Sequence, residues 1–171
     1  KSDLLNLGHS FSDAALDACE GAAIKSYRLF SHDKVAHSKL QRREHTRVPE
    51  ELRFKGGIYK LCPTLVRVAI SLDSPYHIDV VDGRLSLTAE GVTLAEADFY
   101  PRPSYYSKTF PDGVLYWEVV PLLGFGSLPF VTVNKICHLW RSKEECKFCD
   151  INENVRKKKE YGIPFTINKA H

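Results

Sequence analysis

Three cysteines lie close together near the end of the chain, in the sequence ICHLWRSKEECKFCDIN. Eight residues separate Cys137 from Cys146, and Cys146 and Cys149 form a C-x-x-C pair. Three thiolates can hold three irons of a cubane cluster and leave the fourth iron open. An open metal position is what a metal site needs in order to do chemistry. The pattern therefore predicts an iron–sulfur site with Cys137, Cys146 and Cys149 as its ligands.

The residues on either side of the cysteines predict regular structure. Residues 130–136 (FVTVNKI) are apolar and β-branched, which is typical of a strand. Residues 150–161 are charged and helix-like, and Gly162 suits a helix C-cap. An aromatic residue, Phe148, stands immediately before the last cysteine. We therefore expect the three cysteines in a loop between a strand and a helix.

Over about residues 128–165 this arrangement resembles the radical S-adenosylmethionine (SAM) family. The hallmark of that family is a three-cysteine loop after the first strand of a partial TIM-like barrel, with an aromatic residue before the third cysteine. The C-x-x-C pair and Phe148 match it. The interval between the first two cysteines differs, because the common form has three residues there and this chain has eight. Longer first intervals occur in some branches of the family.

The resemblance implies a cofactor set and a reaction. Cys137, Cys146 and Cys149 would ligate a [4Fe–4S] cluster, and SAM would chelate the open iron. Phe148 would pack near the adenine of SAM. Reductive cleavage of SAM to a 5′-deoxyadenosyl radical needs an electron donor such as flavodoxin or ferredoxin, and the substrate stays unknown. The family barrel extends far beyond such a loop, so the resemblance implies an incomplete enzyme that does not turn over alone.

A zinc site is the alternative interpretation of the same cysteines. A C-x-x-C pair with a third cysteine is also a zinc pattern, and Cys137 or His138 could complete it. Zinc ribbons usually carry a second close pair of ligands, which this chain lacks. Cys62 or His171 could also supply a fourth ligand. The alternative function is then a zinc-stabilised, non-enzymatic binding domain.

Composition narrows the other function classes. The chain has 171 residues, of which 43% are hydrophobic and 26% charged, as in an ordinary globular protein. A net charge of +3 does not by itself argue for nucleic acid. No apolar run approaches the length of a membrane span. Clustered thiols, odd in number, suit a metal in a reducing compartment better than disulfides, so we expect a cytoplasmic protein.

The fold expected is α+β, in two parts. Residues 1–125 should form an accessory N-terminal domain, with a helix followed by mainly antiparallel β-structure. Residues 126–171 should begin a partial TIM-like (β/α)6 barrel with its first β-loop-α unit. The helix is expected over residues 11–31, capped by Ser10 or Ser12, because apolar residues recur there near the helical period.

The β-structure is expected from about Gly56 to Ile136, with particular strands and one strong turn signal. Asp82-Gly83 between residues 76–81 and 84–88 predicts a hairpin, because glycine accepts the positive φ of a tight turn. Other predicted strands are residues 59–62, 65–72 and 114–120. The aromatic, proline-rich residues 100–106 are expected to be a loop, and residues 123–129 a joint to the cysteine-bearing strand.

Overall fold

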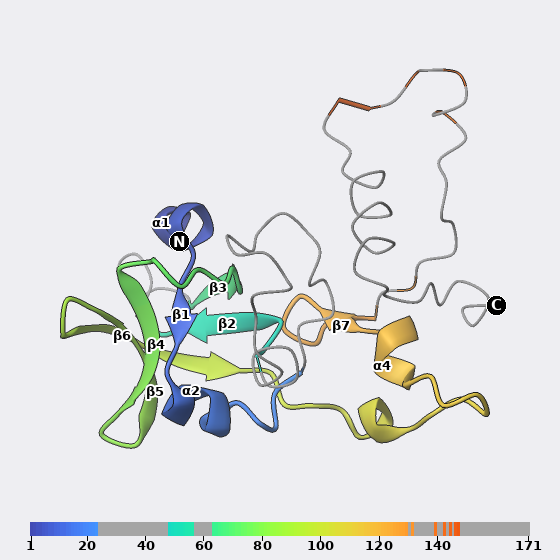
Figure 1. Ribbon diagram of the computed structural model, residues 1–171, viewed down its shortest axis with the longest axis horizontal. Coiled ribbons are helices and arrows are strands. Elements are labelled where there is room, and N and C mark those ends of the chain that lie inside the picture. The colour runs from blue at the N-terminus through green and yellow to red at the C-terminus, as the bar shows by residue number, and fades with distance from the viewer. Residues whose placement is uncertain are drawn as a thin grey trace.

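The computed structural model describes residues 1–23, 48–56 and 63–129, together with the single residues 131, 139, 142, 144, 146 and 147. Its architecture is α+β: a curled, mixed six-stranded sheet with a few short helices (Figure 1). Of the predicted strand at 130–136 only Val131 is described, and the predicted helix at 150–161 and the predicted strand at 59–62 lie outside the described residues. None of the helices in the described part of the chain is long and apolar enough to cross a membrane.

The sheet has the order β1-β4-β5-β6-β2-β3. Its strands are β1 (Ser10–Phe11), β2 (Glu51–Phe54), β3 (Thr64–Arg67), β4 (Tyr76–Val81), β5 (Arg84–Ala89) and β6 (Val92–Phe99). All neighbours are antiparallel except β1 and β4, which run parallel. The predicted hairpin at Asp82-Gly83 is confirmed, with Val81 paired to Arg84 and φ of +50° and +74° at the two turn residues.

The sheet curls until its two ends meet. His9, just before β1, forms a parallel bridge with Ile70, just after β3. Its amide donates to the Ala69 carbonyl at 2.8 Å, and its carbonyl accepts from Ser71 at 3.0 Å. The concave face encloses the main core, because alternate residues of each strand point inward. That core includes Leu16, Cys19, Leu52, Phe54, Val66, Ile78 and Leu87, all buried.

The long helix predicted over residues 11–31 is corrected by the structure. Ser10 and Phe11 belong to β1, and the helix α2 covers only Asp13–Ala18. Ser12 is its N-cap, as one of the two predicted caps, and accepts from the Ala15 amide at 3.1 Å. The chain then turns at Cys19 and meets Pro101 through a bridge at Ala22. Leu16, Cys19 and Ala23 of the predicted apolar face are buried, although the helix ends at Ala18. Residues 24–31 of the predicted helix lie outside the described residues.

The strand predicted over residues 114–120 is wrong. This segment forms the short helix α4 (Tyr116–Val119), and the Glu118 carboxylate accepts the Leu115 amide at 3.1 Å. Trp117 is buried with Tyr106 and Ala23 in a second, smaller core. Tyr106 belongs to the 3-10 helix η3 (Ser104–Ser107), within the segment that we predicted as a loop. A local cap and the burial of one large ring thus overrode the β-propensity of Val114, Tyr116 and Val119.

Two side-chain contacts join β4 to β1 and to Ser12, the residue after β1. The Ser10 hydroxyl lies 2.5 Å from His77 Nδ1, and the Ser12 hydroxyl donates to Asp79 Oδ1 at 2.6 Å. Asp79 also accepts from the Val80 amide at 2.8 Å. These bonds favour the charged carboxylate: the Ser12 hydroxyl first, then the Val80 amide, and then the nearby His77 lower the pKa of Asp79.

The first prediction concerns this carboxylate and pH. Because folding lowers the pKa of Asp79, its contribution to stability is present above the unfolded-state pKa and is lost as pH falls through the folded-state value. We expect Asp79→Asn to be less stable than wild type by a constant amount above about pH 5, with the difference shrinking at lower pH. Urea unfolding at a series of pH values measures it. A difference that stayed constant down to pH 2 would contradict this account.

Candidate metal centre

A small hairpin is the last regular element before the cysteines in the part of the chain that the structure describes. It consists of β7 (Leu122–Leu123) and β8 (Leu128–Pro129), antiparallel to each other. Its turn has three successive residues with positive φ: Gly124 at +60°, Phe125 at +55° and Gly126 at +80°. The Ser127 hydroxyl closes the turn by donating to the Gly124 carbonyl at 2.6 Å. The joint predicted over residues 123–129 is therefore this hairpin, and it spans the predicted boundary between residues 125 and 126.

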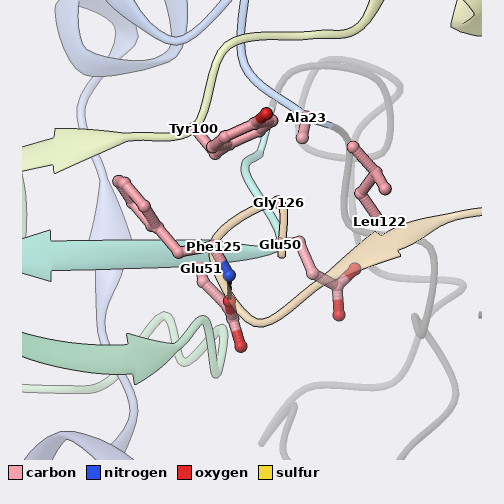
Figure 2. Close-up of a pocket in the computed structure, with 7 residues that line it drawn as sticks. All are labelled: Ala23, Glu50, Glu51, Tyr100, Leu122, Phe125 and Gly126. Atoms are coloured by element: carbon pink, nitrogen blue, oxygen red, sulfur yellow. Dashed lines mark hydrogen bonds between the residues drawn. The ribbon is translucent and has the colours of Figure 1, made fainter. Parts of the chain in front are cut away.

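One carboxylate attaches the hairpin to the sheet. Glu51, the first residue of β2, accepts a hydrogen bond from the Phe125 amide (Figure 2). The same carboxylate forms an ion pair with Arg67 of β3, whose Nη2 lies 3.8 Å from Glu51 Oε1. Arg67 Nε also lies 3.9 Å from the buried Glu50 carboxylate. The guanidinium thus balances two adjacent acidic side chains that are largely removed from water, which is the condition under which buried charge is tolerated.

Ring contacts and one hydrogen bond fix the same hairpin. The Phe125 ring packs edge-on against Tyr100 at 5.7 Å between centroids, and Arg53 of β2 lies 5.0 Å from the centre of the Phe125 ring. Tyr106 accepts from the Leu122 amide at 2.8 Å, which secures the first strand of the hairpin. Contacts from β2, from the end of β6 and from η3 therefore converge on residues 122–126.

A small cavity remains where these groups meet. It is lined by Ala23, Glu50, Glu51, Tyr100, Leu122, Phe125 and Gly126 (Figure 2). Its volume of about 10 Å³ is close to the least that one water molecule needs. The cavity is thus far too small for SAM or for any organic substrate. We assign it to the attachment of the hairpin.

The predicted ligands are described only in part. Cys146 is solvent-exposed and is not in a disulfide. Cys137, Cys149 and Phe148 lie outside the described residues, as do the zinc candidates Cys62, His138 and His171. Within the described ranges no group of three or more His, Cys, Asp and Glu side chains is placed to hold a metal. An exposed thiol is accessible to iron or zinc, so Cys146 suits the predicted role.

Cys19 is a useful contrast to Cys146. It is fully buried in the main core, and burial raises the pKa of its thiol to about 12. A thiol with such a pKa stays protonated at neutral pH, whereas metal ligands must be thiolates. Cys19 is therefore a small core residue, and it provides an internal control for experiments on the clustered cysteines.

Between Cys137 and Cys146 the structure describes the residues Leu139, Ser142 and Glu144. The Glu144 amide donates to the Leu139 carbonyl at 3.1 Å, a bond from residue i+5 back to residue i. The Ser142 hydroxyl lies 3.0 Å from the same carbonyl and 3.0 Å from Glu144 Oε2.

No family model, curated protein or solved structure matches the chain.

The second prediction tests the attachment of the hairpin. A Cβ on Gly126 would fall 2.1 Å from the Tyr100 ring, whereas one on Gly113, at a similar φ of +85°, meets nothing within 4 Å. Gly126→Ala should therefore combine left-handed strain with a steric clash, and Gly113→Ala should show the strain alone. We expect amide exchange at Phe125 to become at least about tenfold faster in Gly126→Ala. Hydrogen exchange followed by NMR measures it, and equal rates in both variants would contradict the proposed packing.

Proposed function

We propose that this chain carries the cluster-binding segment of a radical SAM enzyme, with the curled sheet as its accessory N-terminal domain. The observation that supports this most is the combination of Cys137, Cys146 and Cys149 with Phe148 before the last cysteine. The exposed thiol of Cys146 agrees with it. Under this proposal residues 126–171 contain the first β-loop-α unit of a partial TIM-like (β/α)6 barrel.

The residues of this chain would each have a limited role. The three thiolates would hold a [4Fe–4S] cluster by three of its irons, and Phe148 would pack beside the adenine of SAM at the fourth. Once bound, the cluster would pass one electron from a flavodoxin or ferredoxin to the sulfonium of SAM, giving methionine and a 5′-deoxyadenosyl radical. The protein positions the cofactors and limits access of water and oxygen. The thiolates suit a reducing, cytoplasmic compartment.

The curled sheet would fix the position of the hairpin that precedes the cysteine-bearing segment. Eight residues after β8 ends at Pro129 the chain reaches Cys137. Residues 122–126 of the hairpin are held by contacts with Glu51, Tyr100 and Tyr106. A site that must hold cofactor and substrate in register benefits from attachment to a rigid element.

The third prediction tests the proposal directly. Anaerobic reconstitution of the full chain with iron and sulfide should load about four irons per chain and give a broad visible absorption. The triple variant Cys137/Cys146/Cys149→Ala should lose both, whereas Cys19→Ala should retain them because its thiol is buried and protonated. Adding SAM should change the electron paramagnetic resonance signal of the reduced cluster.

A parallel zinc titration provides the opposing outcome. Tight binding of one zinc per chain through the same cysteines, with no cluster formed under anaerobic conditions, would sink the radical SAM proposal. It would leave the alternative of a zinc-stabilised binding domain.

A further inference from the structure

The β7–β8 hairpin is joined to the six-stranded sheet through side chains. Its two strands pair with each other and form a separate two-stranded sheet. In the part of the chain that the structure describes, the backbone bond of its turn is internal, from the Ser127 amide to the Gly124 carbonyl at 3.3 Å. An element that no backbone ladder joins to the main sheet can separate from it while the sheet stays folded.

The first strand of the hairpin is held at its base by two tyrosine hydroxyls. The Tyr106 hydroxyl accepts the Leu122 amide at 2.8 Å, and the Tyr105 hydroxyl donates to the Val120 carbonyl at 2.8 Å. Tyr106 is buried in the second core, where its ring stacks against Trp117 with 6.3 Å between centroids. The base of the hairpin is therefore fixed to a packed part of the fold.

The turn of the hairpin is held less deeply. Its attachment consists of the bond from the Phe125 amide to the Glu51 carboxylate, the ring contacts of Phe125 and the close approach of Gly126 to Tyr100 (Figure 2). A cavity of about 10 Å³ remains beneath these contacts. On the other side of the turn Leu128 is 55% exposed. The turn therefore lies at the surface, with one carboxylate and one ring as its main supports.

The docked turn also carries backbone strain. Phe125 has a φ of +55°, in the left-handed region that disfavours a bulky L residue by roughly five- to thirtyfold. Its neighbours Gly124 and Gly126 share positive φ values without this cost, because they have no Cβ. Docking of the turn on Glu51 therefore keeps Phe125 in a conformation that it would leave once the turn is free.

We propose that the β7–β8 hairpin is a latch with two positions. In the docked position, which is the ground state, Glu51 binds the Phe125 amide. In the open position the turn has left Glu51 and Phe125 has relaxed, while the base at Leu122 stays on Tyr106 and the six-stranded sheet stays folded. The inference does not depend on the iron–sulfur proposal, because no cysteine takes part. The chain after Pro129 thus follows an element that can move relative to the sheet.

The charge of Glu51 should control the opening. Glu51→Gln retains an acceptor oxygen for the Phe125 amide but removes the negative charge, and charge-assisted hydrogen bonds are roughly twice as strong as neutral ones. Hydrogen exchange of the Phe125 amide should become about tenfold faster. Exchange of the Leu122 amide should not change.

Glu96→Gln is the matched control for the charge. Glu96 lies on β6 and is likewise bound by cationic side chains, with Lys55 Nζ at 3.2 Å and Arg84 as its second partner. None of its ion-pair partners touches the hairpin in the described part of the chain. This variant should leave exchange of the Phe125 amide as in wild type.

A pair of substitutions at residue 125 tests the strain. Phe125→Ala and Phe125→Gly both remove the ring, but alanine retains the left-handed strain and glycine does not. The docked turn should therefore be more stable in the glycine variant. Once intrinsic exchange rates are divided out, protection of the amide of residue 125 should be about fivefold lower with alanine than with glycine.

The experiment is hydrogen exchange followed by NMR on the full chain and these four variants, at several urea concentrations. In wild type the Phe125 amide should exchange with almost no urea dependence, because opening of the turn exposes little surface, whereas the β4–β5 amides should follow global unfolding. The β4–β5 amides also report whether each variant is folded. A Phe125 amide with the urea dependence of the β4–β5 amides, or equal Phe125 exchange in Glu51→Gln and Glu96→Gln, overturns the latch. Equal protection in the alanine and glycine variants overturns the role of strain.

Discussion

The structure depends on the curl of one sheet, which is completed by the bridge between His9 and Ile70. That bridge joins a segment before β1 to a segment after β3, some sixty residues later in the chain. Because the sheet curls, the inward side chains of β2, β3, β4 and β5 reach one another and form a single core. A flat sheet of the same strands would leave much of that apolar surface in water, at a cost of about 25 cal/mol for each Å².

The curl also decides what lies beside β2. Glu51 begins this strand and directs its carboxylate to the turn of the β7–β8 hairpin, while Arg67 on the neighbouring strand balances the charge. Tyr100, the residue after β6, covers Gly126 so closely that no side chain fits there. The hairpin is thus attached to the sheet by charge, by ring packing and by a backbone conformation that its glycines allow. The residues after Pro129 therefore follow a hairpin that is fixed to the sheet.

Several local features could be predicted from the sequence because their causes are local. The Asp82-Gly83 hairpin follows from the φ requirement of a two-residue turn, and the Ser12 cap from the exposed amides at the start of a helix. Other features could not. Residues 114–120 have the composition of a strand, yet burial of Trp117 against Tyr106 makes α4 a helix. Residues 11–31 have helical periodicity, yet Ser10 and Phe11 pair with β4 because the sheet offers them a partner.

The candidate metal site likewise has features that the sequence predicts and features that it does not. The sequence by itself determined which residue types are available: three clustered thiols, an aromatic residue beside the last, and an unusual interval of eight residues. Only the tertiary structure decided that Cys19 is buried and protonated while Cys146 is exposed. It also decided that the Glu144 amide donates to the Leu139 carbonyl, and that Glu51 holds the hairpin that precedes the cysteines. The physical reason is that residue chemistry is a property of each side chain, whereas burial, reach and charge balance arise only when distant segments meet.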